Sequence, residues 1–214
     1  MEKTMTALVI TGGYCNVERA KKMLPVAVDL VIAADSGYAT AQQLGITPDI
    51  TMGDFDSYRE TLPPQMKTLR VPCEKDVTDT MLACEYARDN GCFYITIVGG
   101  TGGRIDHSIS NVFYLEDLRR QGIRVKLTDG ENTVQVVMDE TVTVPKDGGY
   151  FSVFALDSCV VTLTGCKYPL TRAQLIRHRP YAVSNEVTDD CAMVTVQGSA
   201  ILDQQTVNKK FSCA

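Results

Sequence analysis

Three aspartates surround one glycine within a ten-residue segment of the chain, residues 48–57, which read PDITMGDFDS. In extended backbone the carboxylates of Asp54 and Asp56 would lie on one face, roughly 7 Å apart. Repulsion between two such charges costs about 0.6 kcal/mol in water and roughly 2 kcal/mol at an effective dielectric near 20. A partly buried pair of this kind therefore requires a nearby cation.

Further aspartates fall where predicted strands end or where the next predicted helix begins, the edge at which open α/β sheets bind ligands. Hard carboxylates without His or Cys partners suit Mg²⁺, which often completes its coordination shell with substrate phosphates. For any single acid, helix capping (Asp76, Asp79) or turn formation (Asp49, Asp56) is the competing interpretation. The set predicted to gather at one sheet edge consists of Asp35, Asp54, Asp56, Asp76 and Asp79.

A second segment combines glycines with a cation. Residues 98–107 read VGGTGGRIDH, so a predicted strand runs into four glycines and Arg104 before a helix expected from about Asp106. Backbone N–H groups, a helix N-terminus and the guanidinium fork of Arg104 suit phosphate oxygens, although the segment is neither a Walker A motif nor G-x-G-x-x-G. A flexible turn capped by Asp106 and a surface salt bridge of Arg104 are the competing interpretations. Together, the acids and the glycines predict transfer of a phosphate-containing group from a nucleotide.

Two kinds of element follow one another along the chain. Up to about Asp129, strands are expected at 7–13, 30–34, 68–72, 93–100 and 125–129, alternating with helices at 16–24, 38–45, 78–90 and about 106–121. Such alternation predicts a mostly parallel sheet covered on both faces. After Asp129, β-rich segments separated by Gly, Asp and Pro predict a sandwich-like all-β part, in which only residues 170–178 have a helical pattern.

Composition limits the partners. The 214 residues carry a formal charge of −5, which argues against nucleic acid or an anionic membrane as the main partner. No N-terminal signal segment and no apolar run of roughly 20 residues is recognised, so a cytoplasmic protein is expected. Eight cysteines without a C-x-x-C pair predict buried reduced thiols.

Four separated motifs resemble one known family. GDFDS (53–57), EKDVTD (74–79), GGTGGRIDH (99–107) and SNE (184–186) occur in the order and spacing of thiamin pyrophosphokinase, and the match covers nearly the whole chain. The resemblance implies a homodimer in which ATP donates its β,γ-pyrophosphoryl unit to the hydroxyethyl oxygen of thiamin. The products would be thiamin diphosphate and AMP.

The resemblance also assigns residues to roles. It implies that Mg²⁺ is held by Asp54, Asp56 and Asp79, with Asp35 and Asp76 in the same site. It implies ATP contacts at Gly99, Gly100, Gly103 and Arg104, and a substrate-side acid at Asp106. Asp76 or Asp106 would accept the hydroxyl proton, although a loose transition state needs little help from a base.

The last part of the chain resembles the thiamin side of the family's site. Ser184 and Asn185 match its Ser-Asn pair, and Tyr168 stands where relatives place a Trp or Tyr that can stack on an aromatic ring. The cationic thiazolium and flat pyrimidine of thiamin suit such contacts, whereas packing at a strand edge is the competing interpretation for Tyr168. The chain departs from the family in having no Trp and in placing Ser36 where the family commonly has glycine, which would limit the approach of a ligand to that backbone.

The expected fold is a Rossmann-like α/β domain (1–129) that binds ATP and Mg²⁺, followed by a β-sandwich domain (130–214) for thiamin binding and dimerisation. Three other functions remain open. They are a pyrophosphokinase for another heterocyclic alcohol such as a hydroxymethylpterin, a metal-dependent phosphohydrolase, and a non-catalytic thiamin- or nucleotide-binding module. The last is disfavoured because several converging carboxylates would repel an anionic ligand in the absence of a metal.

Overall fold

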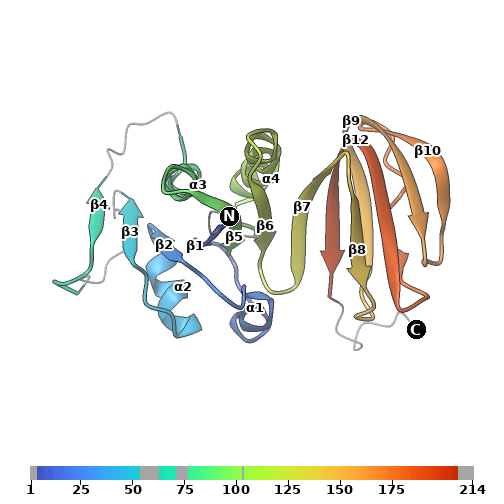
Figure 1. The fold of residues 1–214 in the computed structure, drawn as a ribbon. Helices are drawn as coiled ribbons and strands as arrows, with labels where there is room; N and C mark the ends of the chain where they lie inside the picture. Colours follow the sequence, from blue (N-terminus) through green and yellow to red (C-terminus); the bar gives the residue numbers. More distant parts are fainter. Residues whose placement is uncertain (1–3, 54–62, 71–76, 103, 207–214) are drawn as a thin grey trace. The chain divides into compact units, whose positions relative to one another are not determined.

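The computed structural model describes residues 4–53, 63–70, 77–102 and 104–206. The chain divides into two compact units, Met1–Gly130 and Glu131–Ala214 (Figure 1). Asp54, Asp56, Asp76 and Gly103, all predicted site residues, lie outside the described residues.

The first unit contains a parallel sheet. Its strands are β1 (Met5–Ile10), β2 (Leu30–Ala34), β3 (Ile50–Gly53), β4 (Thr68–Arg70), β5 (Cys92–Val98) and β6 (Arg124–Thr128), in the order β6-β5-β1-β2-β3-β4. Every neighbouring pair is parallel. The chain runs outward from β1 to β4 and then returns to the other side of β1, so the topological switch point lies between β1 and β5.

Four helices among the described residues cover this sheet. Figure 1 shows α1 (Val17–Met23) and α2 (Gly37–Leu44) on one face and α3 (Asp79–Asp89) and α4 (Ile105–Arg120) on the other. Helices α1 and α3 begin at polar caps, because Asn16 Oδ1 accepts from the Arg19 N–H at 3.4 Å and Thr78 Oγ1 accepts from the Met81 N–H at 3.2 Å. Strand β1 is buried from Ala7 to Ile10, as a strand covered on both faces requires.

The predicted alternation of helices and strands in the first unit is confirmed, with one omission. Strand β3 was not expected, because its four residues are too few to show a period and a proline precedes them at Pro48. It pairs in parallel with both β2 and β4.

The second unit is built from antiparallel strands. They are β7 (Asn132–Met138), β8 (Thr141–Pro145), β9 (Tyr150–Thr164), β10 (Leu170–Ile176), β11 (Asn185–Glu186) and β12 (Cys191–Gln205). The long strands β9 and β12 pair with each other along most of their length, with a register shift between Gly198 and Ala200. One end of β12 also pairs with β7 and the other with β8, while β9 pairs with β10 and β11.

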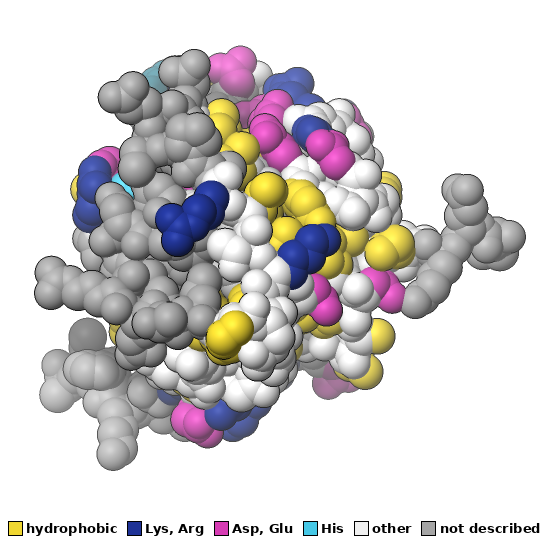
Figure 2. All heavy atoms as spheres, turned by 90° about the vertical axis from the view of Figure 1, so that its left-hand side faces the viewer, with side chains coloured by type: hydrophobic (Ala, Val, Ile, Leu, Met, Phe, Trp, Pro, Cys, Tyr) yellow, Lys and Arg dark blue, Asp and Glu magenta, His cyan; other side chains and the backbone are white. Residues whose placement is uncertain are grey.

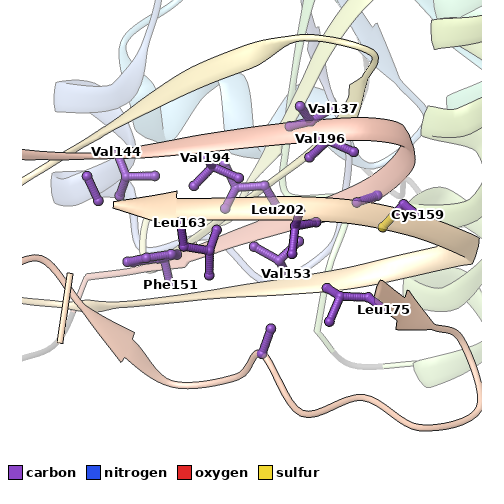
Figure 3. Close-up of a cluster of buried hydrophobic side chains, with 14 of the residues drawn as sticks. Val137, Val144, Phe151, Val153, Cys159, Leu163, Leu175, Val194, Val196 and Leu202 are labelled. Atoms are coloured by element: carbon purple, nitrogen blue, oxygen red, sulfur yellow. The ribbon is translucent and has the colours of Figure 1, made fainter. Parts of the chain in front are cut away.

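The two ends of the long strands share one hydrophobic core. Phe151 and Val153 near the start of β9 belong to the same buried cluster as Leu163 near its end, and Val194 and Leu202 come from the two ends of β12 (Figure 3). The predicted strand-rich second part is therefore confirmed.

The helical pattern expected at residues 170–178 is wrong. Residues Leu170–Ile176 form strand β10, antiparallel to β9. Arg172 has φ 47°, and the register shifts between Leu170 and Ala173. This irregularity interrupts the two-residue alternation of a strand. The apolar residues Leu170, Ala173 and Ile176 then recur every three positions, a spacing that indicates a helix.

Figure 2 shows a face on which the Lys and Arg side chains of the described residues stand apart from one another, among apolar and acidic ones. The described cysteines are free thiols, of which Cys84, Cys92, Cys159 and Cys166 are buried. No helix among the described residues is long and apolar enough to cross a membrane.

Candidate active site

The loops that follow β1 and β5 are joined by backbone hydrogen bonds at the switch point. The Thr11 N–H donates to the Val98 carbonyl at 2.9 Å, and the Tyr14 N–H donates to the Thr101 carbonyl at 3.0 Å. A Cβ added to Gly13 would lie 1.9 Å from the Gly99 carbonyl oxygen. Glycine is therefore required where the two backbones cross.

We call residues 99–102, the described part of the predicted phosphate-binding segment, the glycine loop. Gly99 has φ 79°, and a Cβ on Gly100 would lie 2.4 Å from Leu127 Cδ1. Both glycines are buried, whereas Gly102 is exposed. Packing alone thus explains Gly99 and Gly100, and the exposed end of the loop is the part that a ligand can reach.

The buried carboxylate of Asp129 forms a hydrogen bond with the glycine loop. Asp129 directly follows β6, is only 4% exposed, and accepts at Oδ2 from the Thr101 hydroxyl at 2.8 Å. Its carbonyl accepts from the Asn16 N–H at 2.7 Å, at the start of α1. Asp129 is not among the predicted site residues, although, like Asp35, it is an acid at the end of a predicted strand.

Asp35 lies where the ends of β2 and β3 meet. It has φ 48°, and its N–H donates to the Met52 carbonyl at 2.7 Å. A Cβ on Gly53, the last described residue before Asp54, would lie 3.1 Å from Asp35 Cα. The neighbouring Ser36 fills the adjoining space, because a Cβ on Gly12 would lie 1.8 Å from Ser36 Oγ.

Asp79 is the first residue of α3, which packs against β1, β2, β3 and β5. The cap of this helix is Thr78, not Asp79. An acid in the first turn is favoured by the helix dipole. Because a helix that leads into a parallel strand runs antiparallel to it, the start of α3 lies at the same sheet edge as Asp35. Within the described ranges, no three His, Cys, Asp or Glu side chains come together as a metal site.

Arg104 and Asp106 pair with each other on the surface. Arg104 Nε donates to Asp106 Oδ1 at 3.1 Å, and its Nη2 contacts Oδ2. The bonds from Arg104, with a further one from the His107 N–H, lower the pKa of Asp106, and the same pairing raises the pKa of Arg104. Helix α4 begins at Ile105 with Arg104 as its N-cap residue, so the competing interpretation in which Asp106 caps the helix is wrong. The surface salt bridge considered for Arg104 is present.

In the second unit the three predicted thiamin residues lie together. Asn185 is buried, and its Oδ1 accepts from the backbone N–H groups of Tyr168 and Glu186, both at 3.0 Å. Its Nδ2 donates to the Tyr168 carbonyl at 2.9 Å and contacts Cys166 Sγ at 3.4 Å. The Asn185 amide therefore holds the Tyr168 backbone on both sides.

The Tyr168 side chain itself is 56% exposed, with Lys167 Nζ 5.6 Å from the centre of its ring. Lys167 also pairs with Glu186. The adjoining Ser184 has φ 56°, donates its N–H to Ser152 Oγ at 3.1 Å, and has an exposed side chain. The Tyr168 ring is therefore accessible to a ligand.

These features define an α/β protein of the class that binds phosphorylated ligands at the carboxyl ends of parallel strands. Two family models match the chain: "Thiamin pyrophosphokinase, catalytic domain" at residues 22–127 and "Thiamin pyrophosphokinase, vitamin B1 binding domain" at residues 133–200. The chain belongs to the thiamin pyrophosphokinase family, whose members are transferases.

Individual relatives agree with this membership. The chain is 34% identical over 167 residues to the thiamine pyrophosphokinase of Bacillus subtilis (strain 168), covering 74% of this chain and 78% of that protein. A crystal structure of thiamine pyrophosphokinase from Bacillus subtilis matches with a TM-score of 0.84 and 27% identity, over 95% of this chain and 100% of that one. A thiamin pyrophosphokinase structure from Geobacillus thermodenitrificans matches with a TM-score of 0.80 and 26% identity, over 96% and 99%.

Proposed function

We propose that this chain transfers the β,γ-pyrophosphoryl group of ATP to the hydroxyl of thiamin, giving thiamin diphosphate and AMP. The observation that carries the proposal is the interlocked glycine loop at the switch point, on the sheet edge that also bears Asp35 and the start of α3. The match to both family domains supports the same reaction.

Oxygen donors at this edge fit Mg²⁺. Asp35 and Asp79 are both half-buried carboxylates, and carboxylate oxygens are ligands that Mg²⁺ prefers. We assign Asp54, Asp56 and Asp79 as the residues that would hold Mg²⁺, with Asp35 and Asp76 beside them. When bound, Mg²⁺ would neutralise the negative charge of the ATP phosphates.

The chain's own groups orient the pyrophosphoryl unit. Gly99 and Gly100 shape the glycine loop through close packing, and we assign Gly103 and Arg104 to ATP contacts. Arg104 is well placed to change partners, because its ion pair with Asp106 is solvent-exposed and such pairs contribute little free energy.

A proton leaves the thiamin hydroxyl during transfer, and Asp76 or Asp106 is assigned as its acceptor. While Arg104 holds Asp106, the pKa of that carboxyl is lowered, which makes it a weak base. A loose transition state requires little base assistance, so positioning and charge neutralisation supply most of the rate enhancement.

Thiamin is assigned to the second unit, where Tyr168 offers an exposed ring and Ser184 an exposed hydroxyl. The buried amide of Asn185 serves this site by fixing the Tyr168 backbone. Aromatic stacking and attraction of a cationic ring suit thiamin.

The same proposal covers the fold type of each unit, the ligand that each unit binds and the oligomeric state of the protein. Residues 1–129 act as a Rossmann-like ATP domain and residues 130–214 as a β-sandwich domain for thiamin and dimerisation, in a cytoplasmic homodimer. Free thiols among the described cysteines support a reducing compartment.

Exposed apolar side chains support contact with a second copy of the chain. They are Ile105, Ile109 and Phe113 on α4, and Tyr181 and Val183 in the second unit. Analytical ultracentrifugation tests the dimer, which is contradicted by a mass near 23.5 kDa at micromolar concentration.

A substrate-omission assay tests the reaction. With ATP, Mg²⁺ and thiamin, AMP and thiamin diphosphate are expected to form at the same rate, and AMP formation is expected to stop without thiamin. ATP hydrolysis that continues without thiamin would instead indicate a phosphohydrolase. Faster turnover of a hydroxymethylpterin than of thiamin would indicate a different alcohol substrate, and tight binding without any AMP would indicate a binding module.

A further inference from the structure

Two buried polar side chains hold the glycine loop from neighbouring elements. Asn111, on α4, donates from Nδ2 to the Gly100 carbonyl at 2.8 Å. Asp129, after β6, accepts from the Thr101 hydroxyl at 2.8 Å. Both side chains are at most 6% exposed, so these hydrogen bonds form away from bulk water, where an unsatisfied partner is costly.

Asp129 is itself fixed in place. Its carbonyl accepts from the Asn16 N–H at 2.7 Å, where α1 begins. The next residue, Gly130, has φ 87° and packs so closely that a Cβ there would lie 2.5 Å from the Asn16 carbonyl oxygen. The carboxylate therefore reaches Thr101 from a backbone that has little freedom to shift.

The direction of these bonds matters for an anionic ligand. The carbonyl oxygens of Gly100 and Thr101 are bound by Asn111 Nδ2 and the Tyr14 N–H. Carbonyl oxygens turned toward phosphate would repel it, whereas these two carbonyls are already engaged by the protein, as is the Gly99 N–H, which donates to the Thr128 carbonyl at 2.9 Å. A loop already held in this state has less conformational entropy to lose when ATP binds.

Building on the proposed function, we propose that Asp129 and Asn111 are positioning residues that hold the glycine loop in its ATP-binding conformation before ATP arrives. Neither residue touches ATP in this account. Asp129 acts through the Thr101 hydroxyl and Asn111 through the Gly100 carbonyl. Their loss therefore weakens ATP binding and leaves thiamin binding unchanged.

A matched pair of variants at Thr101 tests whether Asp129 positions the glycine loop through the Thr101 hydroxyl. Thr101→Val keeps the shape of the side chain and removes the hydroxyl, while Thr101→Ser keeps the hydroxyl and removes the methyl group. We expect Thr101→Val to raise the KM for ATP about tenfold, the effect of losing one buried hydrogen bond, and to change the KM for thiamin less than about twofold. Thr101→Ser is expected to restore the KM for ATP.

Binding measured without turnover separates positioning from general destabilisation. Calorimetric titration of α,β-methylene-ATP with Mg²⁺ into the full-length variants, well below their melting temperatures, is expected to show the same tenfold loss. Thr101→Ala, which leaves room for water to reach Asp129, serves if Thr101→Val does not fold. Asn111→Leu is expected to give the same separation between ATP and thiamin.

The inference is overturned if folded Thr101→Val or Thr101→Ala binds the analogue within about twofold of the unmodified chain, or if the KM values for ATP and thiamin rise equally. The proposed function fails in a different way, since the unmodified chain would then form no thiamin diphosphate. The calorimetric titration does not require turnover, so failure of the inference can be distinguished from failure of the proposed function.

Discussion

The side-chain amide of Asn185 binds both backbone groups of Tyr168, accepting from its N–H at 3.0 Å and donating to its carbonyl at 2.9 Å. The two residues lie 17 positions apart in sequence. The contact fixes the segment that carries the exposed Tyr168 ring, so a buried asparagine and a solvent-exposed aromatic form one structural unit.

Replacing Asn185 is expected to reduce both stability and thiamin affinity. Asn185→Leu has a similar volume but leaves the polar backbone groups of Tyr168 without their partner, which should lower the free energy of unfolding by roughly 2 kcal/mol and raise the KM for thiamin. Urea denaturation and steady-state kinetics measure the two effects. Ser184→Ala is the stability control, because its exposed hydroxyl should contribute less than about 0.5 kcal/mol. A raised KM without any loss of stability would mean that Asn185 binds thiamin directly.

Truncation of Tyr168 is expected to affect thiamin alone. Tyr168→Ala should raise the KM for thiamin about fivefold, from the loss of roughly 1 kcal/mol of aromatic and cation–π contact, while Tyr168→Phe should change it little. Because the chain has no tryptophan, Tyr168→Trp also provides a single fluorescent reporter whose emission should be quenched by thiamin. Emission that does not respond to saturating thiamin would remove Tyr168 from the site.

Neutralising Asp79 should reduce turnover much more than stability. Asp79→Asn is expected to lower kcat by about 10² to 10⁴, the range for loss of a group that stabilises transition-state charge. The same change should lower the free energy of unfolding by about 0.3–1 kcal/mol through the helix dipole. Asp89→Asn, at the other end of the same helix, is the matched control and should retain full activity. Asp54→Asn is expected to behave like Asp79→Asn, and near-full activity in either variant would refute the metal assignment.

The Arg104–Asp106 pair gives a prediction that depends on pH. The pKa of Asp106 is lowered chiefly by Arg104, so the stabilising contribution of the pair is present above the usual carboxyl pKa of about 3.9 and is lost as the pH falls through the lowered value. Arg104→Gln should return the pKa of Asp106 toward its ordinary value, as followed by carbon NMR of the carboxyl group.

The same NMR titration tests whether Arg104 changes partners. If Arg104 leaves Asp106 for the phosphates, α,β-methylene-ATP with Mg²⁺ should raise the pKa of Asp106 in the unmodified chain. The analogue should have little effect in Arg104→Gln, which is the control. An unchanged titration in the unmodified chain at saturating analogue would show that Arg104 stays on Asp106.

Local signals in the sequence were enough to predict most of the first unit. Thr78 marks the start of α3, and Gly91 follows its end, so capping chemistry locates the helix. Strand β10 was mistaken for a helix because the backbone at Arg172, with φ 47°, interrupts the strand alternation. Such a bulge depends on pairing with β9, which the sequence of β10 alone does not reveal.

The site was predictable where residue type alone suggests a role, and not where a role depends on a distant partner. Asp35, Asp79 and the glycine loop could be proposed from their positions at strand and helix ends. The contact between Thr101 and Asp129 joins residues 28 positions apart, and only the folded sheet brings them together. The roles assigned to all of these site residues remain predictions, and Asp54, Asp56, Asp76 and Gly103 also lie outside the described residues.

Phosphorus NMR of a single reaction mixture tests the central claim most directly. With ATP, Mg²⁺ and thiamin, the ATP signals are expected to decline while those of AMP and thiamin diphosphate grow in equal amounts. Both phosphates of the new diphosphate should derive from the β and γ positions of ATP. Formation of ADP with thiamin monophosphate, or of ADP with orthophosphate, would contradict pyrophosphoryl transfer.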